Sequence, residues 1–163
     1  MKKIICIILL SISFISCGKI KRRGNFKISR HFTFSEATIS RKGSRLHFNN
    51  YPNKKNYRNI VYTARRMEDI RRIVGKELKI NSWYRSGNIN RLVGGSKHSA
   101  HKDGLAVDFT VNGKWELNNA LRKIRKSGYS FDQIYYHSNS NYIHISFRLN
   151  RRRERKQIYY RRK

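Results

Sequence analysis

The chain has 163 residues, of which 38 are lysine or arginine and nine are aspartate or glutamate, giving a formal charge of +29 at pH 7. This length suits one domain with a modest core and excludes two domains of ordinary size. Such a charge predicts attraction to polyanions, namely nucleic acid, anionic lipid or cell-envelope polymers, without choosing among them.

The N-terminal residues have the features of an export signal. Met1-Lys2-Lys3 is positively charged, and residues 4–15 are apolar except for two serines. This run is too short to span a bilayer but has the length of a signal-peptide core. Phe14-Ile15-Ser16-Cys17 resembles a bacterial lipobox. We therefore expect a lipoprotein-type signal over residues 1–16, a lipid on Cys17, a basic linker over residues 17–30 and a location at the bacterial cell envelope; a plain secretory signal is the alternative.

The cysteines limit the chemistry of the domain that follows. Cys6 lies in the apolar run, and Cys17 is the expected lipid attachment site. Neither a disulfide framework nor a cysteine-ligated zinc site is then available. Any metal ion must be held by histidine, aspartate or glutamate.

Hydrophobic spacing predicts two helices and several short strands. Apolar residues recur at helical spacing over residues 55–74 and 116–127, and a glycine follows each run, at Gly75 and Gly128. Strands are expected at residues 78–84, 105–111, 134–136 and 142–147, with a polar turn over residues 85–88 and a hairpin formed by the last two strands. Because βαβ alternation is absent, we predict an α+β domain over residues 31–148, a small antiparallel sheet flanked by helices. Residues 149–163 are expected to form a basic C-terminal tail.

Candidate metal ligands concentrate in residues 96–109, SKHSAHKDGLAVDF. Gly104 indicates a loop that enters a strand, so that the loop delivers His101 and the strand delivers Asp108 to one point. In residues 142–147 the strand period of two places His144 on one face with Tyr142 and Ser146. Two histidines and an aspartate with one open position suit a catalytic zinc ion. The alternative is a packed strand histidine and an ordinary turn aspartate.

The order of the motifs resembles a known family. Ser82-Trp83-Tyr84-Arg85-Ser86, Gly94-Gly95-Ser96, Ser99-x-His101-x-x-Gly104-x-Ala106-x-Asp108 and Tyr142-Ile143-His144-Ile145-Ser146 follow one another along the chain, with Phe32 to Glu36 upstream and Phe131-Asp132-Gln133 between the last two. This series is similar to the D-Ala-D-Ala metallocarboxypeptidases of the LAS superfamily, which share the hedgehog/D-Ala-D-Ala peptidase-like fold, and in particular to their phage and bacterial single-domain branch. The likeness covers residues 32–147.

The resemblance implies one zinc ion held by His101, Asp108 and His144, with a metal-activated water attacking a peptide carbonyl. It also implies that Arg85 binds the substrate carbonyl and stabilises the negative charge that develops on its oxygen. Ser99 matches a motif serine that supports the loop or the substrate.

The general base departs from the family pattern. Some branches place an acidic residue three positions before the last zinc histidine, where this chain has Asn141; others place a glutamate at a position that corresponds to His137. A neutral histidine can accept a proton near pH 7, and an asparagine cannot. We therefore predict His137 as the base, the alternative being a site that binds zinc with little or no turnover.

The resemblance implies hydrolysis of the peptide stems of bacterial peptidoglycan, at a D-Ala-D-Ala bond (carboxypeptidase) or an L-Ala-D-Glu bond (endopeptidase). A catalytically weak or inactive lipoprotein that binds the cell wall or other polyanions is the second hypothesis. A nucleic-acid-binding protein is the third, although the charge alone predicts non-specific, salt-dependent binding to nucleic acid.

Overall fold

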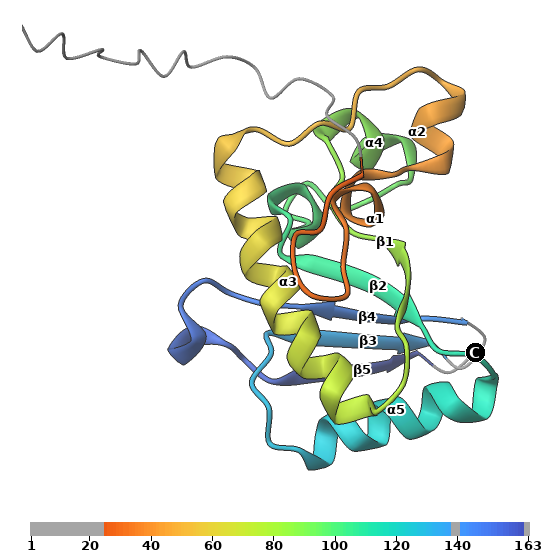
Figure 1. Cartoon of the computed structure of the whole chain (residues 1–163), viewed down its shortest axis with the longest axis vertical. Coiled ribbons are helices and arrows are strands. Elements are labelled where there is room, and N and C mark those ends of the chain that lie inside the picture. The colour runs from red at the N-terminus through yellow and green to blue at the C-terminus, as the bar shows by residue number, and fades with distance from the viewer. Residues whose placement is uncertain (1–24, 138–140, 162–163) are drawn as a thin grey trace, which may run out of the picture.

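The computed structural model describes residues 25–137 and 141–161, with a five-stranded sheet in the order β1-β2-β4-β3-β5 (Figure 1). The strands are β1 (Lys79–Ser82), β2 (Ala106–Thr110), β3 (Gln133–His137), β4 (Ile143–Ser146) and β5 (Gln157–Arg161). The helices are α1 (Phe34–Thr38), α2 (Arg41–Arg45), α3 (Lys54–Val74), α4 (Gly87–Leu92) and α5 (Lys114–Lys126), with 3-10 turns η1 (Ala100–Asp103) and η2 (Arg151–Arg153). The α+β prediction is confirmed.

The helix α3 crosses one face of the strands in Figure 1. The Asn53 side chain caps its first turn by accepting from the backbone N–H of Asn56, and Gly75 ends it with φ of 71°. This helix buries one face of apolar residues at helical spacing, among them Ile60, Ala64, Met67 and Ile70. The helix predicted from residues 55–74 is confirmed.

The two faces of the sheet differ in character. The strands β1, β2, β4 and β3 are paired antiparallel, as the sequence predicted. Alternate residues such as Val107, Ile134 and Ile145 are fully buried on the side of the helices. Because strand side chains alternate between faces, the residues between them, Asp108, Tyr135 and His144, lie on the opposite face. The polar residues of the sheet are thus collected on one side.

The fold extends beyond the C-terminal boundary expected from the sequence. Residues 157–161, predicted to be part of a basic tail, form β5, which pairs in parallel with β3 in the register Tyr135 to Tyr159. Ile158 packs partly buried against the core. The sequence did not predict β5 because the surrounding residues are rich in arginine and show only a weak apolar pattern. An edge strand can form without a strong pattern, since it needs little apolar surface and tolerates charge.

The fold also begins before residue 31. Phe26 stacks on Phe34 with ring centroids 5.0 Å apart, Lys27 forms a β-bridge with Thr33, and Ile28 packs against the core. The linker expected over residues 17–30 is therefore packed on the domain from residue 25. Residues 1–24, with Cys17 and the expected signal, lie outside the described residues.

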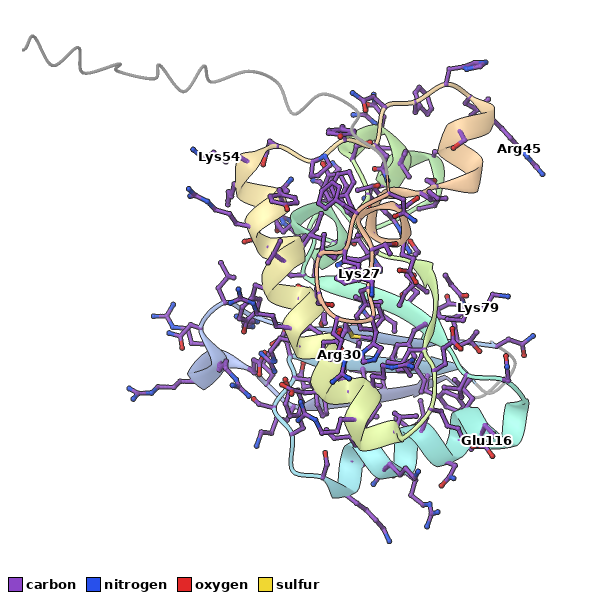
Figure 2. All side chains as sticks on the ribbon, in the orientation of Figure 1. Lys27, Arg30, Arg45, Lys54, Lys79 and Glu116 are labelled. Carbon is purple, nitrogen blue, oxygen red and sulfur yellow. The ribbon has the colours of Figure 1, made fainter. Side chains whose placement is uncertain are left out.

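The short helices were not predicted. In α1 the side chains of Thr33 and Glu36 form a capping box. The helix α4 begins at Gly87, within the polar turn predicted over residues 85–88, so that turn is shorter than expected. Exposed basic residues such as Arg45, Lys54 and Lys79 point outward from separate elements in Figure 2. Within the described residues no helix has both the length and the apolar character needed to span a bilayer.

Candidate metal centre

The structure brings His101, Asp108 and His144 together, and their ligand atoms all lie within 4.8 Å of one another. Asp108 Oδ1 lies 2.7 Å from His144 Nδ1 and 3.2 Å from His101 Nε2. The two histidine nitrogens are 3.2 Å apart. Among the described residues this is the set of histidine and acidic side chains that could hold a metal ion.

Sheet pairing places two members of the set. Asp108 on β2 and His144 on β4 are direct cross-strand partners. Directly opposed residues on one face have their side chains about 5 Å apart at Cβ. A register shift of one residue would move either side chain to the apolar face.

The third member, His101, is placed by a turn that the core fixes. His101 lies in η1, whose capping residue Gly104 has φ of 74°. The buried Trp83 indole donates from Nε1 to the Gly104 carbonyl oxygen at 3.1 Å. The Trp83 carbonyl oxygen in turn lies 2.6 Å from His101 Nδ1. One aromatic residue at the end of β1 therefore fixes both the turn and the histidine.

The hydrogen bond to Trp83 decides which nitrogen of His101 faces Asp108. A carbonyl oxygen can only accept, so Nδ1 carries the hydrogen. Burial lowers the pKa of His101, although the neighbouring Asp108 opposes this. A neutral ring then directs the lone pair of Nε2 toward a carboxylate oxygen that also accepts. Two acceptors at this distance fit a shared cation, and the donor set suits zinc.

Asp108 is held ionised. Burial alone would raise its pKa, but the charges and hydrogen bonds of His101 and His144 lower it well below the usual value. Arg85 Nη2 donates to the second carboxylate oxygen at 2.5 Å. The carboxylate is therefore available as an anionic ligand near neutral pH.

The other predicted site residues lie around this centre. Arg85 Nε also donates to Ser82 Oγ at 2.8 Å, so two contacts orient the guanidinium beside Asp108. Ser99 is the capping residue of η1, and its side chain makes no capping hydrogen bond. Asn141 is exposed. The side chain of His137 and residues 138–140 lie outside the described part of the chain, so the predicted base stays a prediction.

A groove of about 880 Å³ contains the three candidate ligands together with Arg85 and Ser99. Its lining also includes Asp132, Gln133 and Tyr142, which lie in the quoted motifs without an assigned role, and Tyr135, Arg148 and Arg155, which the sequence did not single out. Arginines were too abundant for these two to be noticed in the sequence. The strand period in residues 142–147 did place Tyr142 on the face of His144.

The sequence matches a known protein family. The sequence profile of the peptidase M15 family matches residues 29–146, which is well over half of the chain and includes every candidate ligand. Among curated proteins, none matches the sequence. The family consists of metallopeptidases of the LAS type, so the resemblance inferred from the motifs is confirmed. The chain therefore belongs to the peptidase M15 family.

Proposed function

We propose that the protein is a zinc-dependent peptidase that hydrolyses peptide stems of bacterial peptidoglycan. The observation that carries this proposal is the convergence of His101, Asp108 and His144 in one groove within the segment matched by the peptidase M15 family. Two histidines and one carboxylate leave a coordination position open, which is typical of catalytic rather than structural zinc sites. Bound zinc supplies a Lewis acid that activates water and polarises the substrate carbonyl.

The chain's own residues supply orientation and charge. Trp83 and Gly104 hold His101 in place, and sheet pairing holds Asp108 and His144. Arg85, the predicted oxyanion-binding residue, lies beside Asp108 and lines the groove. A guanidinium positioned there stabilises negative charge on the carbonyl oxygen as the peptide bond is attacked. His137 is the proposed proton acceptor, and Ser99 the proposed support for the substrate.

The scissile bond is either the terminal D-Ala-D-Ala bond or the L-Ala-D-Glu bond. The test is a digest of purified muropeptides by the zinc-loaded full chain, followed by mass spectrometry. Loss of one alanine identifies a carboxypeptidase, and release of a longer stem fragment identifies an endopeptidase. A chelator should block either product, and zinc should restore it. Unchanged muropeptides after incubation with folded, zinc-loaded protein would overturn the proposal.

A second candidate is a cell-wall-binding protein of the same fold without turnover. It is favoured by the exposed Asn141, which occupies the position of an acidic base in part of the family, and by the formal charge of +29. For this candidate we expect zinc binding and sedimentation with cell walls, but no change in muropeptide mass. Turnover in the same digest separates the two functions.

We also propose that the protein is exported and anchored by a lipid on Cys17, where its substrate lies. The support is the charged and apolar sequence of residues 1–16 ahead of this cysteine. A Cys17→Ser variant should leave the membrane fraction and lose incorporation of labelled fatty acid. Equal labelling of the variant would exclude Cys17 as the attachment site.

A further inference from the structure

The groove that holds the candidate zinc ligands also contains a pair of arginines on a single carboxylate. Arg148 Nε donates to Asp132 Oδ1 at 2.6 Å. Arg155 donates from Nε to Oδ1 at 2.9 Å and from Nη2 to Oδ2 at 2.6 Å. Two cations thus share one buried anion, and the cluster carries a net positive charge toward the groove.

The two guanidiniums keep donors for a ligand. Each has five N–H groups, of which the contacts to Asp132 use one in Arg148 and two in Arg155. Both side chains are 41% exposed, whereas the Asp132 side chain is 9% exposed. The carboxylate is buried beneath the arginines, and the arginines face solvent in the groove. The single Asp132 carboxylate therefore orients the two guanidiniums without neutralising both of their charges.

Arg155 comes from the part of the chain beyond the family match. That match ends at residue 146. The neighbouring Glu154 forms a salt bridge with Arg66 at 3.0 Å, with side-chain exposures of 0% and 5%. Backbone N–H groups of Lys156 and Gln157 donate to the carbonyl oxygens of Phe131 and Asp132. The segment is therefore fixed on both sides of Arg155, so little ordering is needed when a ligand binds.

A row of side chains on β3 connects this pair with the metal centre. Gln133 and Tyr135 line the same groove as the arginines and lie on the face of the sheet that carries His144. The Tyr135 ring packs edge-on against His144, with centroids 5.4 Å apart, and stacks on Tyr159 of β5 at 4.7 Å. A peptide bound at His144 and extended along β3 would therefore reach Arg148 and Arg155.

We propose that Arg148 and Arg155 form a subsite for a carboxylate of the peptide substrate, away from the bond that is cut. The inference rests on the proposed function and adds a specificity to it: the substrate carries a free carboxylate, and the C-terminal segment helps to recognise it. A guanidinium matches the planar geometry of a carboxylate through paired N–H donors. The subsite positions the substrate, and it takes no part in proton transfer.

The test measures cleavage of two stem peptides by the zinc-loaded full chain. The peptides differ in one group away from the scissile bond, which is a free carboxylate in one peptide and a carboxamide in the other. We expect the wild type to prefer the carboxylate form in kcat/KM by about tenfold or more, the usual worth of a charge-assisted hydrogen bond. In Arg155→Gln and Arg148→Gln this preference should fall toward one, mainly through a higher KM for the carboxylate peptide. Arg155→Lys should keep part of the preference.

The matched control is Arg153→Gln, which removes the same charge from an exposed residue of η2 outside the groove lining. It should leave the preference unchanged; an equal loss in this variant would overturn the subsite and point to overall charge. Equal losses on both peptides in Arg155→Gln would also overturn it. A third result would also overturn it: Arg155→Gln loses binding to a glycerol-phosphate polymer but keeps the preference for the carboxylate peptide. The arginine pair would then bind phosphate groups instead of a substrate carboxylate.

Failure of the proposed function gives a different result. If the wild type cuts neither peptide, the peptidase proposal fails, and the subsite is judged by the affinity of the zinc-loaded chain for the same two peptides. The carboxylate form should then bind more tightly, and Arg155→Gln should remove the difference. Should Arg155→Gln not fold, Arg148→Gln carries the test, because Arg155 alone still occupies both oxygens of Asp132.

Discussion

Arg85 and Asp108 form an ion pair in which Nη2 lies 2.5 Å from Oδ2, at the edge of the candidate metal centre. The same carboxylate meets both histidines through its other oxygen, Oδ1. The guanidinium is thus held beside the candidate metal ligands, where the proposed function requires a group that stabilises the substrate oxyanion. This contact links the arginine of the first motif with the ligands of the later ones.

We expect Arg85→Ala to lower kcat by about 10²- to 10³-fold at saturating zinc, the usual cost of removing a donor to the oxyanion. Ser82→Ala, which removes only the contact to Arg85 Nε, should have a smaller effect. Steady-state kinetics at several zinc concentrations measures both. If excess zinc restored full activity to Arg85→Ala, the arginine would serve only to orient Asp108.

The general base is tested by His137→Ala. Hydrolysis should be abolished, because the activated water would lack a proton acceptor, while the zinc content stays near one ion per chain as in the wild type. Asn141→Ala is the matched control at the other candidate position, and it should retain activity. Full activity of His137→Ala would exclude His137 as the base.

Gly104 combines a left-handed backbone with a close contact to α3. Its φ is 74°, and an added Cβ would lie 2.7 Å from Ile60 Cγ1 and 3.2 Å from the Asn56 carbonyl oxygen. We expect Gly104→Ala to lower the free energy of unfolding by about 2–4 kcal/mol and to reduce zinc affinity, because η1 carries His101.

The control for this variant is Gly128→Ala. Gly128 has φ of 69°, and nothing lies within 4 Å of an added Cβ. This variant should lose only the backbone part, about 1 kcal/mol, and bind zinc normally. Equal losses of stability in the two variants, measured by urea unfolding, would contradict the role of the contact with Ile60.

The contacts of Glu68 predict that part of the free energy of unfolding is lost at acidic pH. Its carboxylate accepts from Ser29 Oγ, the backbone N–H of His31 and the His31 ring, each at 2.7 Å. Burial alone would raise its pKa, but the hydrogen bonds from His31 and Ser29 lower it below the usual value of 4.5. As the pH falls, Glu68 is protonated in the unfolded chain at a higher pH than in the folded chain. The stabilisation is therefore complete above the unfolded pKa and is lost as the pH falls through the folded pKa.

We expect Glu68→Gln to lower the free energy of unfolding at pH 7 by about 1 kcal/mol, because a neutral amide is a weaker acceptor for the partly exposed Ser29 and His31 donors. Below about pH 4.5 the difference between variant and wild type should shrink as the wild-type carboxylate is protonated. The exposed Glu77→Gln is the control and should not change the pH dependence. A constant difference from pH 7 to pH 3 would contradict the prediction.

The sequence by itself determined the elements that depend on local spacing. The apolar period over residues 55–74, with Gly75 after it, is sufficient to specify α3 within one residue. The antiparallel hairpin of β3 and β4 follows from two short apolar runs close together in the chain. The residues His101, Asp108 and His144 were recognisable because they lie in short motifs that follow one another in the order typical of the family.

Only the tertiary structure decided the remainder, because it depends on pairing between distant residues. Nothing local in the arginine-rich residues 149–161 specifies a parallel strand beside β3, and one partly buried Ile158 is too weak a pattern. The contacts of Trp83 with His101 and of Arg155 with Asp132 join residues 18 and 23 positions apart. Composition predicted Arg155 as part of a basic tail, and apolar spacing predicted a strand that contains Trp83; the packing of the sheet placed Trp83 in the core and Arg155 in the groove.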